Sequence, residues 1–198
     1  MNNRMQGQAP HVPTGGVRHY GERVFNAERR DPYEQGGKYR EPTQCSGCGA
    51  IWHRGRWQWG AAPVGAQAAV CPACRRIHDK LPAGTVVLEG DFAVVHREEL
   101  VRLVRNVAER EGREHPLHRL MQVAETPERV VIETTDIHLP QRIGEAVQSA
   151  YDGDLDVRYG DNEYSARVIW RPGYKANRWE TWRWWSSGLS QSSSHSWS

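Results

Sequence analysis

The sequence contains no long apolar run. Its longest apolar stretches, Thr85–Leu88 and Ala93–Val95, are only long enough for strands, whereas a helix that crosses a membrane needs about 20 apolar residues. The first residues also have no apolar segment of the kind that export signals contain. We therefore expect a cytoplasmic protein with no membrane partner.

Motifs of the common enzyme classes are also missing. The sequence has no phosphate-binding loop, no nucleophile motif and no spacing that suggests an open metal site. Asp136 and His138 are a carboxylate and an imidazole close in sequence, which is a pattern that proton transfer uses. Asp136 precedes an amphipathic run, however, so a helix N-cap is the favoured interpretation. We expect a protein that is not an enzyme, has no catalytic residues and binds no small-molecule substrate.

Cysteine is scarce, and its placement is the most informative feature of the chain. All four cysteines fall in two Cys-x2-Cys pairs, Cys45/Cys48 and Cys71/Cys74, with 22 residues between the pairs. This spacing is typical of a zinc ribbon or treble-clef knuckle, in which four thiolates fill a tetrahedral shell and leave no position for substrate. We predict one structural Zn²⁺. Disulfides and a thioredoxin-like redox site are the less favoured alternatives.

The residues around the cysteines suit two tight turns. Gly47 and Gly49 flank Cys48, where backbone N–H groups have to turn toward sulfur, and Pro72 fixes φ inside the second turn.

Charge is unevenly distributed along the chain. Residues 81–170 contain 10 Lys or Arg against 17 Asp or Glu, whereas residues 1–40 contain 7 against 4 and residues 41–80 contain 5 against 2. An acidic body beside basic segments is suited to placing one surface against a polyanion.

Composition divides the chain into four parts. Residues 1–40 form a predicted disordered basic arm, residues 41–80 the zinc knuckle, residues 81–172 an α+β domain, and residues 173–198 a mostly disordered tail rich in Trp and Ser.

Within 81–172, the hydrophobic pattern predicts the order β-α-β-β-α-β-β. The expected elements are a β-rich stretch over 84–95 that is interrupted at Gly90-Asp91, a helix over 97–111, strands over 120–124 and 130–134, a helix after Asp136 that ends near Gly153, and a hairpin of 155–159 with 164–170. This order favours an α+β sandwich of ferredoxin-like type, with two helices on one face of the sheet.

Arginine and tryptophan alternate around the knuckle, which favours RNA binding by phosphate contact and base stacking. The predicted RNA-binding residues are Arg54, Arg56, Trp57, Trp59, Arg75, Arg76, His78 and Lys80. Two alternatives remain open at this point: the tryptophans pack over the zinc core, or the arginines balance the negative charge of four thiolates around Zn²⁺.

Three segments resemble a known family. Cys45–Trp57, Cys71–His78 and Thr134–Gly144 are similar to a family of small bacterial zinc-binding proteins, which is distantly similar to the amino-terminal part of nonsense-mediated mRNA decay protein three. That protein is an adaptor of the large ribosomal subunit. The resemblance spans about residues 40–172 and implies zinc binding by the four cysteines, a small α+β domain after them, and ribosomal RNA or protein as partner. The adaptor differs in having more Cys-x2-Cys pairs and a further carboxy-terminal domain.

Together these observations predict a non-catalytic, zinc-binding protein that binds structured RNA on or near the large ribosomal subunit. The alternative is a protein–protein interaction adaptor, in which the acidic α+β domain and the Trp-rich tail make the contacts and the zinc only stabilises the fold.

Overall fold

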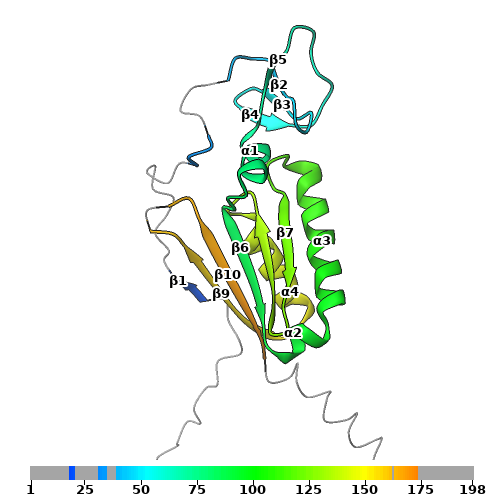
Figure 1. Ribbon diagram of the computed structural model, residues 1–198, viewed down its shortest axis with the longest axis vertical. Helices are drawn as coiled ribbons and strands as arrows, with labels where there is room; N and C mark the ends of the chain where they lie inside the picture. Colours follow the sequence, from blue (N-terminus) through cyan, green and yellow to red (C-terminus); the bar gives the residue numbers. More distant parts are fainter. Residues whose placement is uncertain (1–17, 21–30, 35–38, 162, 174–198) are drawn as a thin grey trace, which may run out of the picture.

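The computed structural model describes residues 18–20, 31–34, 39–161 and 163–173 of the chain. Most of the predicted basic arm and nearly all of the predicted Trp-rich tail, including Trp179–Trp185, lie outside the described residues. Figure 1 shows a small module at one end of an elongated body.

The body is built on a mixed six-stranded sheet with helices packed against it. Its strands are β1 Arg18–Tyr20, β6 Gly84–Glu89, β7 Leu120–Glu125, β8 Arg129–Thr134, β9 Gly153–Tyr159 and β10 Ala166–Pro172. Its helices are α2 Asp91–Val95, α3 Arg97–Glu114 and α4 Leu139–Ala150. The strand order is β1-β9-β10-β6-β8-β7, and β1–β9 and β10–β6 are the parallel pairs.

The predicted α+β class is confirmed, and the finer topology differs from the ferredoxin-like pattern at one edge. The strands β6, β8 and β7 lie side by side and antiparallel, with α3 in the connection from β6 to β7. A ferredoxin-like sheet then places the strand after the second helix antiparallel to the first strand. Here the second strand of the final hairpin, β10, occupies that place and runs parallel to β6.

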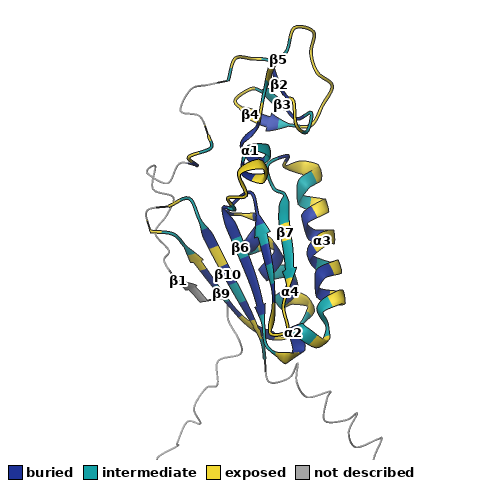
Figure 2. Cartoon of the chain, viewed as in Figure 1, coloured by how far each residue is buried: buried dark blue, intermediate teal, exposed yellow. Residues whose placement is uncertain are grey.

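The core lies between α3, α4 and one face of the sheet. Registered neighbours on three strands, Val86, Ile132 and Val168, all point to this face and are fully buried. They pack with Val104 of α3 and Ile143 of α4 among others. In Figure 2 the residues coloured as buried are concentrated along the strands and along one side of α3. This burial follows from the period-2 pattern of the strands and the 3.6-residue pattern of the helices.

The β structure predicted before the interruption at Gly90-Asp91 is confirmed, and that predicted after it, up to Val95, is wrong. The strand β6 ends at Glu89, Gly90 turns the chain with φ 95°, and residues 91–95 form the short helix α2. Tertiary packing explains the difference, because the Phe92 ring is buried against Tyr151 and Trp170, with ring centroids at 5.3 Å and 6.0 Å. Helical backbone is what turns Phe92 into the core, so packing overrides the β propensity of Val94 and Val95.

The module at the end of the body contains all four cysteines, and we call it the Cys module (residues 39–80). Its four-stranded sheet has the order β4-β3-β2-β5, and the helix α1 follows it. Its elements are β2 Thr43–Cys45, β3 Ile51–His53, β4 Arg56–Gln58, β5 Gln67–Ala69 and α1 Pro72–Asp79.

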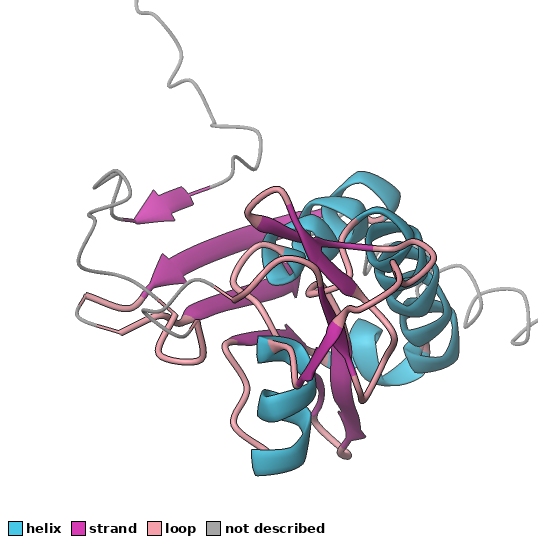
Figure 3. Cartoon of the chain, turned by 90° about the horizontal axis from the view of Figure 1, so that it is seen from above, coloured by secondary structure: helices cyan, strands magenta, loops and turns pink. Residues whose placement is uncertain are grey.

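Contacts between described residues join the Cys module to the body, among them two hydrogen bonds and one apolar contact. The Trp59 indole N–H donates to the carbonyl of Gly112 at 2.6 Å, the Arg119 guanidinium donates to Cys74 Sγ at 3.2 Å, and Leu117 packs against the buried cysteine cluster. Seen from above, the Cys module lies over the upper ends of the body's strands and helices (Figure 3).

Packing around α4 gives a stability prediction. In Gly144→Ala the new Cβ would lie 2.7 Å from Val168 Cγ1 and 2.8 Å from Leu155 Cδ1. We expect the variant to lose about 1–3 kcal/mol of unfolding free energy through overpacking, although alanine is the better helix former. Gly112→Ala in α3 is the matched control, since its Cβ meets nothing closer than 3.4 Å, and a gain of up to about 1 kcal/mol is expected. Denaturant unfolding of both variants checks this, and equal effects would contradict it.

Candidate metal centre

The two cysteine pairs, 22 residues apart in sequence, come together at one point. The four Sγ atoms all lie within 4.8 Å of one another, and Cys48 Sγ and Cys71 Sγ are 3.8 Å apart. Tetrahedral Zn–S bonds of about 2.3 Å put neighbouring sulfurs about 3.8 Å apart. All four cysteines are free thiols, so the structure contains no disulfide between them. The four side chains are therefore positioned to hold one metal ion.

Backbone geometry brings each pair to this point. The Cys45–Cys48 turn follows β2 and is closed by the bond from Gly49 N–H to the carbonyl of Cys45 at 2.9 Å. A Cβ on Gly47 would lie 3.0 Å from Cys74 Sγ, and Gly49 has φ 79°, so both positions suit glycine. The second pair lies at the start of α1, where the Cys71 thiol accepts from Cys74 N–H.

The thiols differ in how readily they ionise. Burial on its own would raise the pKa of Cys45. Hydrogen bonds from the backbone N–H of Cys71, whose nitrogen lies 3.3 Å from Cys45 Sγ, and from N–H groups around Cys48 have the opposite effect and lower this pKa to about 7. Burial raises the pKa of Cys48 to about 11, aided by the neighbouring thiol of Cys45. Burial also raises the pKa of Cys71 strongly. A metal ion that bound here would displace protons from the last two thiols.

Arg119 is a part of this centre that sequence reasoning missed. It comes from the body, 45 residues beyond Cys74, and its guanidinium donates to Cys74 Sγ at 3.2 Å. A partly buried cation beside four sulfurs offsets the excess negative charge that a metal site with four thiolate ligands carries. No local spacing links Arg119 to the cysteines. The sequence offered only the general signal that some arginine would balance the charge.

Arg75 and Arg76, predicted to contact RNA, are instead used inside the protein. The side chain of Arg76 is only 4% exposed and forms an ion pair with Asp31. The guanidinium of Arg75 donates to the carbonyl of Tyr33 and, at 2.8 Å, to the hydroxyl of Tyr39. The two arginines therefore hold residues 31–34 and Tyr39 against α1, and these contacts remove Arg75 and Arg76 from the predicted RNA-binding surface.

Trp57 is also unavailable for stacking on a base. It is 8% exposed and packs with Trp52 and Tyr39, at centroid distances of 5.7 Å and 5.0 Å, next to Cys45. The alternative in which the tryptophans pack over the metal core thus holds for Trp57. Trp59 is 43% exposed, but its indole N–H is bonded to the body.

The remaining predicted residues lie at the surface in two places. Arg54 and Arg56 are exposed in the hairpin of β3 and β4, and His78 and Lys80 are exposed at the end of α1. In the hairpin, the backbone N–H groups of Arg54 and Gly55 donate to the Glu41 carboxylate at 3.0 Å and 2.9 Å and lower its pKa. At α1, His78 is paired with Asp79 at 2.9 Å.

The Asp136 carboxylate caps the start of α4 as predicted, although the residue directly before the helix is His138. Asp136 Oδ2 accepts from the backbone N–H groups of His138 at 2.7 Å and Leu139 at 3.0 Å, at the start of α4. The carboxylate is buried, and burial raises its pKa while the two N–H groups and His118 oppose that effect.

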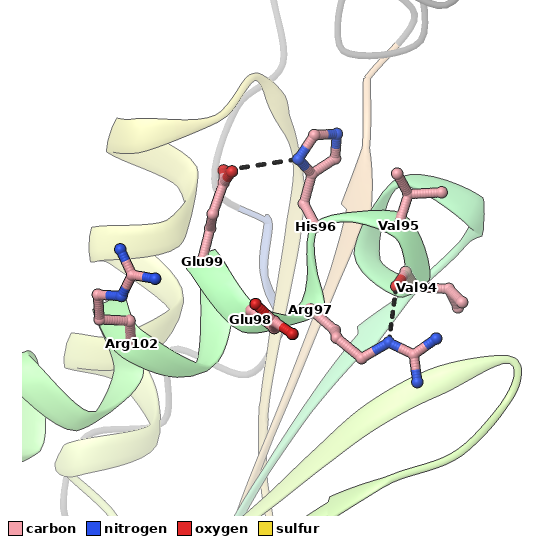
Figure 4. Close-up of a pocket in the computed structure, with 7 residues that line it drawn as sticks. All are labelled: Val94, Val95, His96, Arg97, Glu98, Glu99 and Arg102. Atoms are coloured by element: carbon pink, nitrogen blue, oxygen red, sulfur yellow. Dashed lines mark hydrogen bonds and ion pairs between the residues drawn. The ribbon is translucent and has the colours of Figure 1, made fainter.

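Open hollows lie beside α3 in the described part of the body. The first, of about 380 Å³, lies where α2 meets α3; there Arg97 Nε donates to the carbonyl of Val94, and His96 lies 3.5 Å from Glu99 (Figure 4). Its side chains are engaged in local contacts at the helix ends. The second, of about 400 Å³, borders the Cys module at Trp59 and is also lined by His118 and Arg119.

No protein-family model, curated protein or solved structure matches this chain. The resemblance to the bacterial zinc-binding family and the ribosomal adaptor therefore stays a prediction. In the described part of the chain, the helices are too short or too polar to cross a membrane.

Metal removal should unfold the Cys module and leave the body folded. Structural zinc supplies on the order of 10 kcal/mol to small modules of this kind, and the apolar core here is small. In Cys71→Ser, or after chelation, we expect the amides of β2, β3 and β4 to lose their protection from hydrogen exchange while those of β6 and β8 keep theirs. Ser46→Ala, at an exposed neighbour, is the control. Full protection of β2–β4 in metal-free protein would contradict the assignment.

Metal affinity should depend steeply on pH. At pH 8 the thiols of Cys48 and Cys71 are protonated, because their pKa values are raised, whereas Cys45 is largely ionised. If the metal-free module is unfolded, its thiols keep an ordinary pKa of about 8.5, so that more than two of the four are protonated up to pH 8. Binding must therefore release at least two protons from either state, and the association constant should rise at least about 100-fold per pH unit between pH 6 and 8. Competition titrations with a chromophoric chelator measure this slope. A slope of one proton or fewer would show that these thiols are not ligands.

Proposed function

We propose that this protein holds one zinc ion in a structural four-cysteine centre and binds structured RNA through the exposed hairpin of β3 and β4. The observation that carries the proposal is the pair of exposed arginines, Arg54 and Arg56, on a hairpin that the cysteine centre holds in place.

Zinc is supported by the donor set. Four thiolates in a tetrahedral arrangement select Zn²⁺ over hard cations, which prefer oxygen ligands. The sequence of knuckle, hairpin and helix, with Cys71 at the start of α1, supports the treble-clef alternative over the ribbon. A structural role is supported because four protein ligands fill the coordination shell.

RNA binding by the hairpin is supported by how its charges are arranged. The nearby acid, Glu41, has both carboxylate oxygens bonded to the backbone of the hairpin turn. Its charge is thus partly satisfied by amide groups, and within the described residues the Arg56 guanidinium has no ion pair. Solvated guanidinium groups on a rigid turn are suited to contact phosphate oxygens.

Ribosomal RNA is the first RNA to test, and the cytoplasm is the expected location. The choice of ribosomal RNA is supported by the resemblance of three segments, Cys45–Trp57, Cys71–His78 and Thr134–Gly144, to a bacterial zinc-binding family that is distantly similar to the large-subunit adaptor. The cytoplasmic location is supported by the four free thiols, which need a reducing compartment.

The ferredoxin-like type of the body is likewise our proposal, supported by the arrangement of β6, α3, β7 and β8.

The test is binding of the full chain to large-subunit ribosomal RNA over a salt series. We expect Arg54→Ala/Arg56→Ala to weaken binding and to lower the slope of log K against log salt concentration by about one for each arginine that contacts phosphate. Arg102→Ala/Arg110→Ala, which removes the same charge from the exposed side of α3, should leave both quantities unchanged.

Equal loss in the two double variants would mean that only net charge matters and would remove the hairpin as the binding surface. Absence of RNA binding by the metal-loaded protein would favour the adaptor alternative, in which the contacts are to protein.

A further inference from the structure

A second group of metal-ligating side chains lies where α3 ends. Glu111 is in the last turn of α3, His115 is its C-cap residue, and His118 follows in the next turn. One ligand atom from each of the three lies within 4.8 Å of those from the other two. This group is separate from the four cysteines and has no part in the function proposed above.

Local backbone geometry creates the group. Residues four apart on a helix share a face, which places Glu111 beneath His115. The chain then curls back, because the His118 N–H donates to the carbonyl of His115 at 2.9 Å, and the two imidazole rings lie 4.6 Å apart. The spacing Glu-x3-His-x2-His is visible in the sequence, but it depends on where the helix ends.

His118 is held between two carboxylates. Its Nδ1 is 3.8 Å from Glu111 Oε2, and its Nε2 is 3.5 Å from Asp136 Oδ2. Within the described residues, Nδ1 is buried and has no hydrogen-bond partner. An imidazole with one nitrogen toward a cation and the other toward a buried carboxylate is the usual environment of a metal-binding histidine.

We propose that Glu111, His115 and His118 bind a divalent transition-metal ion, with Asp136 orienting the ring of His118. Two imidazoles and one carboxylate suit Zn²⁺ and its neighbours in the first transition row rather than Mg²⁺ or Ca²⁺. Bonds of about 2.0–2.2 Å place neighbouring ligand atoms about 3.4 Å apart in a tetrahedron, so small side-chain rotations from the observed separations complete the site. His115 is exposed and is able to make such a rotation.

This site differs in kind from the four-cysteine centre. Three protein ligands leave a fourth coordination position for water or an anion, whereas four thiolates leave none. His115 is exposed, so the site lies at the surface, where a fourth ligand can come from solvent.

A simpler explanation leads to a different result. The same residues would form only an ion-pair network if a protonated His118 bridged Glu111 and Asp136. Such a network binds no second metal ion.

The experiment is a Co²⁺ titration of the full, metal-free chain at pH 8, followed by absorption spectroscopy. We expect two equivalents, one with thiolate-to-metal charge-transfer absorption and one without it. His115→Ala and His118→Ala should each lose only the second equivalent, and His78→Ala, an exposed histidine outside the group, should keep both.

Asp136→Asn tests the orienting role. Asparagine retains an acceptor for the helix cap, so the circular dichroism spectrum should be unchanged, while the affinity of the second equivalent falls about 10–100-fold. Unchanged affinity would remove Asp136 from the site.

One equivalent in the wild-type chain, or a second equivalent that survives both histidine changes, would overturn the metal site. If His118→Ala fails to fold, the Co²⁺ titration of His115→Ala, a change at an exposed residue, decides by itself whether the metal site exists. Because the charge-transfer band reports the four-cysteine centre separately, and RNA is not involved, failure here is distinguishable from failure of the proposed function.

Discussion

The Cys module depends on the convergence of four sulfur atoms. The buried apolar cluster around the sulfurs is small for a folded unit. Its buried members are Cys45, Ala50, Trp57, Cys71 and Ala73, and two of these five are themselves cysteines. A metal ion held by the sulfurs would join the knuckle after β2 to the start of α1 and fix the strands between them. The packing of Tyr39 and Trp57, and the position of the exposed hairpin, follow from that link.

The segment between α3 and β7 connects this centre to the body. Arg119 reaches Cys74, and the preceding residue, His118, belongs to the second candidate site. Thr135 holds the segment in place, since its hydroxyl donates to the carbonyl of Leu117 and accepts from the Arg119 N–H at 3.0 Å. The adjacent residues His118 and Arg119 therefore lie at two different clusters of metal-ligating side chains. Asp136, which follows Thr135, lies beside His118.

Arginine and tryptophan have two different roles in the Cys module that composition does not separate. Arg76 is buried in an ion pair and Arg54 is exposed, although both lie close to a cysteine pair. In the same way Trp57 is in the core and Trp59 is half exposed. Trp57 lies within β4 and packs with Tyr39 and Trp52, whereas Trp59 follows the end of β4 and its indole N–H donates to the carbonyl of Gly112 in the body.

The sequence by itself determined the cysteine cluster, the α+β class, the positions of α3 and α4, and the capping by Asp136, because each depends on local spacing or periodicity. Only the tertiary structure decided that residues 91–95 are helical, that β10 lies parallel to β6, that Arg119 accompanies the cysteines, and that Glu111, His115 and His118 meet. These features arise from contacts between segments far apart in sequence, or from the residue at which a helix ends, and local patterns carry little information about either.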